Sequence, residues 1–423
     1  MSSSTPSNRW LVVLGAILIQ LALGAIYAWS VFTPALKADP YNFTASQTQW
    51  VFSVGLAVFA LVMIIAGRLQ AKYPPKRIAI LGGLILGLGY FLAGFAGTSF
   101  AGLVITIGVI GGAGIGLAYV VPIAVGVKWF PDKKGLLTGL AVAGFGFGAL
   151  IWVKLAGAWG HLIENHGVAS VFQMYGVAFA IMVVVGALWM VNPPEGYKPE
   201  GWNPPPPTQA SATGAVQMSS AEMLRTPQFY GLWFMFIAGA MAGLMVIGVI
   251  ALFGIDALKA SGLDETSAKV AAGTAMAVFY SLANALGRIG WGSISDKLGR
   301  KTSLFLMLLI QGVVMLLFYK MGSTVATFYL AATLVGFNFG GNFALFPAAT
   351  ADYFGNKTVG LNYGWVFSAY GVGGILGPQL AAHFKDAAIG GNVEAWMTPF
   401  MIAGIACLAA AAVALTLNPP RKA

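Results

Sequence analysis

One positive charge, Arg288, stands in the otherwise uncharged stretch "SLANALGRIGWG", from Ser281 to Gly292. Arg288 precedes Asp296 by about 12 Å of helix, which places it near the middle of a bilayer whose hydrocarbon half-thickness is ~15 Å. An arginine there costs about 2.5–3.5 kcal/mol. Its planar fork matches a carboxylate, and Asn284, one turn earlier on the same face, can orient the fork or bind the same anion. The pair predicts a carboxylate site; the alternative, a structural ion pair, lacks an obvious acidic partner nearby.

The composition indicates a membrane protein with several spanning helices, because 58% of the 423 residues are hydrophobic and only 9% are charged. The net charge of +10 is scattered in short clusters, unlike the continuous basic face that binds nucleic acid. The one cysteine, Cys407, can form neither an intrachain disulfide nor a cysteine–histidine zinc site. We therefore expect no metal, cofactor, nucleic-acid partner or enzymatic activity. The oligomeric state stays open, and a monomer is plausible from the sequence.

Twelve apolar segments are long enough to cross a bilayer, which takes roughly 20 residues of helix. The expected fold is all-α, with twelve transmembrane helices. The first segment is too long for a signal peptide, so we expect it to be retained. Glycine runs within the fourth and fifth segments predict close helix packing. The segments are 10–33, 46–67, 78–97, 101–127, 135–159, 168–191, 229–256, 267–292, 302–321, 324–349, 361–384 and 395–417.

The segments fall into two sets of six, joined by a proline-rich polar stretch that cannot continue a helix. We expect a first bundle over 1–191, a cytoplasmic linker over 192–228 and a second bundle over 229–423. The halves look like copies, because an offset of 225 repeatedly joins identical residues: Gly67 and Gly292, Pro122 and Pro347, Gly135 and Gly360, Gly139 and Gly364, Gly146 and Gly371. Parallel repeats of this kind predict alternating access.

The basic residues give the expected orientation. Most of the 23 lysines and arginines fall in loops and tails on the side of both termini, and five lysines fall in the opposite loops: Lys37, Lys259, Lys269, Lys320 and Lys385. Positively charged loops face the cytoplasm. We therefore expect a multi-pass protein of the plasma membrane, the bacterial inner membrane, in contact with lipid and with both termini cytoplasmic.

The loop after the eighth segment reads "GSISDKLGRK", from Gly292 to Lys301. It places an acid, Asp296, beside the basic residues Lys297 and Arg300 at a helix end. Such a cluster can pair across the two halves in one conformation and separate in another, so we expect it to act in gating. Positive-inside charge alone would explain the basic residues but not Asp296.

The same loop matches the signature of the major facilitator superfamily at every fixed position. Further stretches resemble the branch of that superfamily that contains the oxalate:formate antiporter and the monocarboxylate transporters, and the resemblance covers nearly the whole chain. These stretches are "RWLVVLGAILIQLALGAIYAWSVF", "KWFPDKKGLLTG", "EMLRTPQFYGLW", "GGNFALFPAATADYFG" and "NYGWVFSAYG". The resemblance implies transport of small organic anions, with the arginine of the eighth helix, here Arg288, binding the substrate carboxylate.

The resemblance also implies an aromatic pocket around Arg288. For each ring taken alone, simple packing is the commoner explanation, although the hydroxyl of Tyr119 would need a partner if buried. The pocket positions are Tyr27, Tyr119, Phe145, Phe339, Phe343, Phe367 and Tyr370. Tyr370 stands where the oxalate antiporter has a second cation, a lysine. A dicarboxylate would then bring in an unpaired charge at a cost of several kcal/mol, so a monocarboxylate of the lactate or pyruvate class is expected.

Acids that could carry a proton inside the membrane are scarce. Asp256, towards the outer end of the seventh segment, could be ionised in the empty carrier and protonated when substrate neutralises Arg288. Anion and proton would then move together; a surface acid at a helix end is an equally good interpretation. Lys154, in the fifth segment, is the other charge, besides Arg288 and Asp256, that we expect inside the membrane.

Three functions therefore stay open. The first is a secondary transporter that carries a small monocarboxylate with a proton. The second is an anion exchanger of the oxalate:formate kind. The third is a membrane sensor that binds the anion without moving it, which the repeat and the intact loop signature disfavour.

Overall fold

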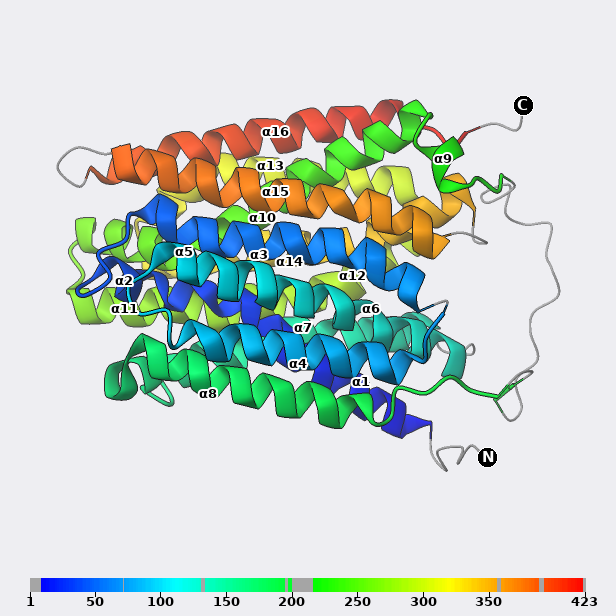
Figure 1. Cartoon of the computed structure of the whole chain (residues 1–423). Coiled ribbons are helices and arrows are strands. Elements are labelled where there is room, and N and C mark those ends of the chain that lie inside the picture. The colour runs from blue at the N-terminus through cyan, green and yellow to red at the C-terminus, as the bar shows by residue number, and fades with distance from the viewer. Residues whose placement is uncertain are drawn as a thin grey trace.

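The protein is a bundle of long helices that run side by side (Figure 1). Every regular element in the part of the chain that the structure describes is a helix. This computed structural model describes residues 9–70, 72–130, 134–194, 197–199, 216–355, 359–387 and 392–420. The expectation of an all-α fold is confirmed.

Six crossings precede the linker and six follow it. Those of the first half are α1 (Trp10–Leu23) continued by the 3-10 helix η1 (Gly24–Val31), α3 (Ala45–Leu69), α4 (Pro75–Ala93), the run α5 (Phe100–Leu103), η2 (Val104–Gly111) and α6 (Gly112–Trp129), α7 (Lys134–Ala156), and α8 (Leu162–Ala187). Those of the second half are α10 (Pro227–Ala260), the run α11 (Glu265–Thr274), η3 (Ala275–Tyr280) and α12 (Ser281–Leu298), α13 (Arg300–Met321), α14 (Val325–Phe354), α15 (Val359–Ala387), and η5 (Val393–Trp396) with α16 (Met397–Thr416).

Length and composition support twelve membrane crossings. Ten helices among the described residues are long and apolar enough to span a bilayer. The other two, α7 and α15, have 23 and 29 residues, which is roughly 35 Å and 44 Å of helix. Short helices lie between crossings: α2 (Thr33–Lys37) after η1, and α9 (Ser220–Met223) before α10.

The helix ends follow local sequence signals. Thr44 caps α3 in a reciprocal pair with Gln47, and Thr226 followed by Pro227 starts α10. Gly299, between α12 and α13, has φ +82°, a conformation that glycine adopts without strain. Gly167 breaks α8 with φ +74°, so the segment predicted from residue 168 onwards corresponds to the part of α8 that follows this break.

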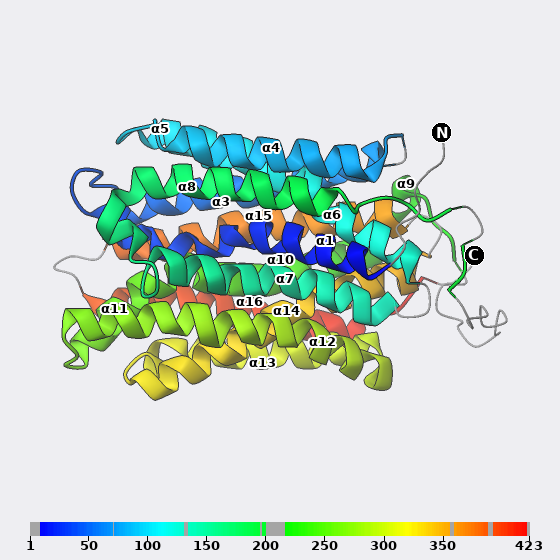
Figure 2. The same ribbon diagram turned by 90° about the horizontal axis from the view of Figure 1, so that it is seen from below.

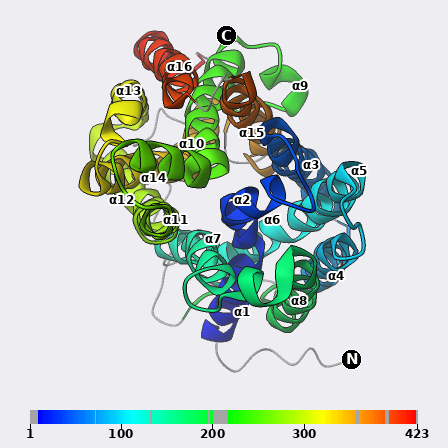
Figure 3. The ribbon, with the colours of Figure 1, turned by 90° about the vertical axis from the view of Figure 1, so that its left-hand side faces the viewer.

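The two sets of crossings form adjoining groups. Seen along the helices, α1 to α8 lie together and α10 to α16 lie together, and the groups meet where α3 packs beside α15 and α7 beside α12 (Figure 3). Of the linker expected over 192–228, residues 195–196 and 200–215 lie outside the described residues, so the domain boundaries stay a prediction.

Small residues bring the helices close together. A Cβ atom on Gly148 would lie 2.3 Å from the carbonyl oxygen of Leu21, and one on Gly114 would lie 2.3 Å from the backbone nitrogen of Leu86. Any larger residue would push these helices apart. The interpretation of the glycine runs as packing surfaces is confirmed.

The two ends of the bundle differ. The start of α1, the end of α16 and α9 lie at one end, here called the terminal end, and α2 and the start of α11 lie at the other, the far end (Figures 1 and 2). At the far end Asp386 of α15 accepts 2.7 Å hydrogen bonds from the backbone amides of Ala45 and Ser46 of α3. These amides are first-turn donors that have no partner within their own helix. Asp386 therefore joins the two halves.

A second contact closes the same end. One turn further along α3, Gln49 Nε2 donates a 3.0 Å hydrogen bond to the carbonyl oxygen of Gly248 on α10. Gln49 is fully buried. The halves are thus held together by polar contacts at the far end in this conformation.

Asp386→Asn should weaken the far-end closure, because the amide keeps only one of the two acceptor oxygens, turns its NH2 donor towards the other backbone amide and loses the negative charge. Losing about 1 kcal/mol would raise the open population about fivefold. Maleimide labelling of Thr48→Cys, a fully buried far-end position, in a Cys407→Ser background measures that population in detergent. Glu394→Gln, at an acid of the same end, serves as the control. Equal labelling rates in all three proteins would contradict the role of Asp386.

Candidate anion-binding site

Arg288 lies in the interior of the bundle, on α12, and is only 5% exposed. Its Cζ atom stands 4.1 Å from the ring centre of Phe343 on α14 and 6.0 Å from that of Phe145 on α7. Both rings therefore present their π systems to the cation, one from each half of the protein. The guanidinium group lies at the junction of the two halves.

The backbone of α12 is held tightly against α14 around this arginine. A Cβ atom on Gly287 would lie 2.0 Å from the carbonyl oxygen of Phe337, and one on Gly340 would lie 2.2 Å from that of Asn284. Only glycine fits at either position. Two glycines bring the helix backbones into contact beside Arg288. The backbone position of Arg288 is therefore fixed, which limits the directions in which its guanidinium can point.

The guanidinium has unused hydrogen-bonding capacity. Its Nε donates to Asn284 Oδ1 at 3.4 Å, as the spacing predicted. Among the described residues, neither Nη atom has a hydrogen-bond acceptor within 3.5 Å and no carboxylate lies within 4.0 Å; the Tyr119 hydroxyl interacts with the guanidinium only beyond hydrogen-bond distance. Buried donors without partners are costly. A carboxylate that accepts from both Nη atoms would satisfy them and neutralise the charge.

The predicted aromatic residues gather around Arg288. Tyr27 of η1 and Tyr370 of α15 share a hydrogen bond of 2.9 Å between their hydroxyls, which links the two halves. The other rings form a continuous set of edge-to-face and tilted contacts around this pair, with Phe367 stacked on Tyr370 and centre distances from 4.8 to 6.4 Å: Tyr119, Phe145, Phe339, Phe343 and Phe367. All nine residues predicted for the site meet here, and their binding role stays a prediction.

The structure adds residues that the sequence interpretation missed. Phe59 of α3 packs its ring 5.1 Å from Tyr119 and 5.7 Å from Tyr370. Tyr280 donates its hydroxyl to the carbonyl oxygen of Gly243 at 3.0 Å. The repeat held a signal for Phe59, because the offset of 225 maps it onto Asn284, but no motif marks Tyr280.

Asp256 is not a neighbour of Arg288. Its carboxylate accepts hydrogen bonds from Lys385 Nζ and, at 2.8 Å, from Trp396 Nε1. It lies thirteen residues, or ~20 Å of α10, beyond Gly243 towards the far end. The expected compensation of Arg288 by Asp256 is therefore absent in this conformation, and a role of Asp256 in carrying protons stays a prediction. Lys154 Nζ, also near the far end, lies 3.4 Å from Thr274 Oγ1 across the two halves.

The predicted gating residues lie at the terminal end. Arg300 Nη1 pairs with Asp296 Oδ1 at 3.0 Å and Arg300 Nε with Asp352 Oδ2 at 3.1 Å; Arg300 also contacts the hydroxyl of Ser295. Lys297 is exposed. All these partners belong to the second half, so the expected pairing across the halves is not present in this conformation. Asp352 was missed because it lies 52 positions from Arg300 in the chain.

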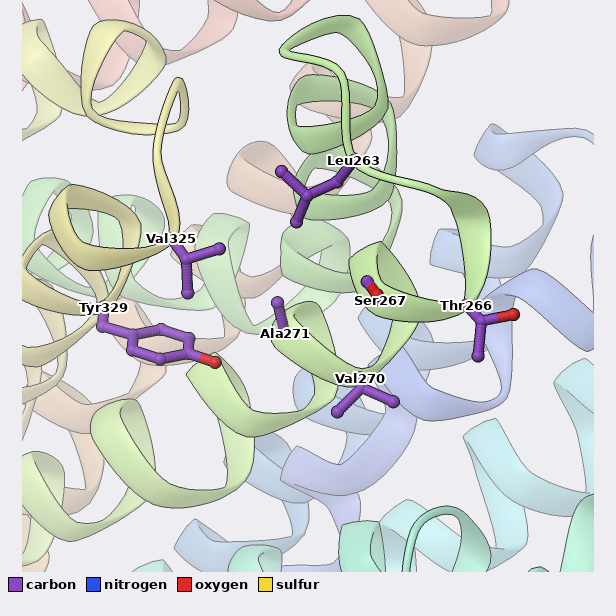
Figure 4. A pocket seen from close by; sticks show the side chains of 7 residues that line it. All are labelled: Leu263, Thr266, Ser267, Val270, Ala271, Val325 and Tyr329. Atoms are coloured by element: carbon purple, nitrogen blue, oxygen red, sulfur yellow. The ribbon is translucent and has the colours of Figure 1, made fainter.

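A separate hollow of about 340 Å³ opens on the surface at the far end (Figure 4). It lies between α11 and the start of α14, and its lining is uncharged: Leu263, Thr266, Ser267, Val270, Ala271, Val325 and Tyr329. Its lining has hydroxyl donors but no cation to neutralise a carboxylate, so Arg288 remains the candidate site.

Comparison with known proteins agrees with this geometry. The family model for the Major Facilitator Superfamily matches residues 18–279 and 263–423. The chain is 33% identical over 381 residues to an uncharacterized MFS-type transporter, YhjX, of Escherichia coli (strain K12), covering 88% of each protein. It is 28% identical to the oxalate:formate antiporter of Oxalobacter formigenes, over 99% of this chain and 93% of that protein. It is 26% identical to apicoplast pyruvate carrier 1 of Toxoplasma gondii, over 86% and 81%.

A solved structure has the same fold. It is a bacterial homolog of the human lysosomal transporter Spinster in an inward-facing, unoccupied conformation, with a TM-score of 0.67 and 15% identity. The match covers 98% of this chain and 97% of that one. The twelve-helix arrangement is therefore shared with a protein of very different sequence.

Arg288→Lys should weaken binding of a small carboxylate, because an ammonium keeps the charge but cannot present two parallel donors. Losing one charge-assisted hydrogen bond, about 1.5–3 kcal/mol, lowers affinity roughly ten- to 150-fold. Isothermal titration of the purified protein with lactate and pyruvate measures the change, and Arg68→Lys, at the end of α3, is the matched control. Wild-type affinity in Arg288→Lys would remove Arg288 from the site.

Proposed function

Because the chain belongs to the Major Facilitator Superfamily, we propose that it is a secondary transporter of small monocarboxylates that works by alternating access. The observation that carries this proposal is the buried guanidinium of Arg288, which has two unpartnered Nη atoms. It lies between rings of both halves, so a bound anion would contact both halves at once. Rocking of one half against the other would then expose the anion to one side at a time.

The charge of the site supports a single carboxylate. Among the described residues around the aromatic set, Arg288 is the one cation, and Tyr370 uses its hydroxyl in the bond to Tyr27. A dicarboxylate would keep one charge uncompensated in a low dielectric. The aromatic walls suit the short apolar part of lactate or pyruvate. Relatives whose names include oxalate:formate and pyruvate are consistent with organic anions as substrates.

The proposed orientation assigns a side of the membrane to each end. With both termini cytoplasmic, the far end that Asp386 and Gln49 close faces outward. The basic and acidic cluster of Arg300 and Asp296 then lies on the cytoplasmic side, where it would hold α12, α13 and α14 together as the halves move. In this conformation the carrier would be closed to the outside.

Cotransport of the anion with a proton is one candidate for the coupling mode, and exchange of one anion for another is a second, suggested by the lack of a carboxylate beside Arg288 among the described residues. Without an acid beside it, the empty site keeps a full positive charge, and moving that charge through a closed low-dielectric state is unfavourable. A bound anion removes the obstacle in both directions. Proton cotransport instead requires a group that ionises when the site empties, and Asp256 is held by Lys385 and Trp396.

Substrate valence can be tested by competition in proteoliposomes. Uptake of labelled lactate should be inhibited strongly by pyruvate-sized monoacids and at least tenfold more weakly by oxalate, because a single cation neutralises only one carboxylate. Lactamide, which has the shape of lactate without the charge, is the control and should not compete. If oxalate competed as well as pyruvate, a second cation would have to reach the site, and Lys154 would be examined first.

The coupling mode can be tested by comparing two driving forces. One set of vesicles is preloaded with unlabelled lactate; the other set is empty and has an inward proton gradient. The preloaded vesicles should take up labelled lactate at least tenfold faster, because the carrier with a bound anion changes conformation without a net charge in its site. If the empty vesicles took up lactate as fast as the preloaded ones, and a protonophore abolished that uptake, proton cotransport would be established instead. Loss of that gradient-driven uptake in Asp256→Asn, with exchange retained, would then identify Asp256 as the proton carrier.

A further inference from the structure

The helical run that carries Arg288 changes its exposed face part-way along. Residues 18 positions apart lie on the same face of a regular α-helix, because 18 residues make roughly five turns. Ala268 of α11 is fully buried, yet Leu286 of α12 is 60% exposed. Val270 is 56% exposed, yet Arg288 is 5% exposed. A regular helix that buried Ala268 would therefore have placed Arg288 on an outward face.

A turn of π-helix between the two parts accounts for the change. The segment η3, Ala275–Tyr280, joins α11 to α12. A π-turn spaces its hydrogen bonds by five residues and so adds a residue without the matching rotation. Everything after η3 is thereby turned about the helix axis relative to α11. This rotation brings Asn284 and Arg288 to the interior.

Ser281 holds this turn in place. Its backbone N–H bonds to the carbonyl oxygen of Met276, five residues earlier, and its hydroxyl donates to the same oxygen at 2.8 Å. In a regular α-helix the backbone partner would be residue 277. Tyr280 fixes the same turn from outside through its hydrogen bond to Gly243 of α10. Both side chains are buried.

We propose that Ser281 is a positioning residue for anion binding: by tying the Met276 carbonyl into the π-turn, its hydroxyl sets the rotation of α12 that aims Arg288 into the site. This inference rests on the proposed function, in which Arg288 binds the carboxylate. Ser281 acts through Arg288 and touches no substrate. The hydroxyl, rather than the size of the side chain, is the feature that matters.

The variants separate the hydroxyl from other effects. Ser281→Ala removes the bond from the hydroxyl to the Met276 carbonyl, keeps the backbone bond, and should lower lactate affinity roughly three- to tenfold, in line with the loss of one hydrogen bond. Ser281→Thr keeps the hydroxyl and should retain more of the affinity. Thr350→Val is the matched control, because Thr350 is a buried residue of α14 whose hydroxyl donates to the Phe346 carbonyl at 2.7 Å in a regular helix. Loss of the Thr350 hydroxyl should leave the affinity for lactate unchanged.

A second readout follows the rotation of α12 without substrate. A spin label on Leu286→Cys, in a Cys407→Ser background, should be accessible to oxygen dissolved in lipid, and Ser281→Ala should reduce that accessibility while Thr350→Val does not. An unchanged label in Ser281→Ala overturns the inference. If the accessibility of the label changes while lactate affinity stays at the wild-type value, the π-turn does set the rotation of α12. The role of Arg288 in the proposed function is then overturned.

Discussion

An arginine buried without an acidic partner is the constraint on which the rest of this structure depends. The guanidinium of Arg288 contacts Asn284 through one side-chain hydrogen bond and lies against two phenylalanine rings and near the Tyr119 hydroxyl, and neither Nη atom has an acceptor within 3.5 Å among the described residues. Ring faces and one amide compensate only part of the cost of burying a charge. In the proposed function, the bound carboxylate would supply the partner that this charge lacks.

The surrounding helices keep the arginine at the junction of the halves. Gly287 and Gly340 bring α12 and α14 into backbone contact, and the π-turn of η3 sets the rotation of α12. Across the junction, Tyr27 bonds to Tyr370. The contacts between halves at the far end are a few hydrogen bonds, which can break and re-form at small net cost because water replaces the lost partners. Across the junction α3 packs along α15 and α7 along α12, while a few polar bonds join the halves at the far end. Two packed halves that meet along such a junction are an arrangement suited to alternating access.

Much of this could be predicted from the sequence. Apolar segment length gave the twelve crossings, and one charge in an apolar stretch identified Arg288, because both signals are local. Pairings between distant residues could not be foreseen: Asp256 with Lys385 and Arg300 with Asp352 depend on how helices meet. The repeat carries further information about the site, since the offset of 225 maps Phe145 onto Tyr370 and Phe59 onto Asn284, all of which lie in the site. The π-turn has no sequence signal.

The central claim is that the two Nη atoms of Arg288 bind the substrate carboxylate. Solid-state NMR on the protein in lipid, with ¹⁵N-labelled arginine and pyruvate carrying ¹³C in its carboxylate, measures that distance directly. Hydrogen bonding from the guanidinium predicts a ¹³C–¹⁵Nη separation of about 3–4 Å, with the dipolar signal lost in Arg288→Lys. Saturable pyruvate binding without any ¹³C–¹⁵Nη dephasing, or dephasing that persists in Arg288→Lys, would contradict the account.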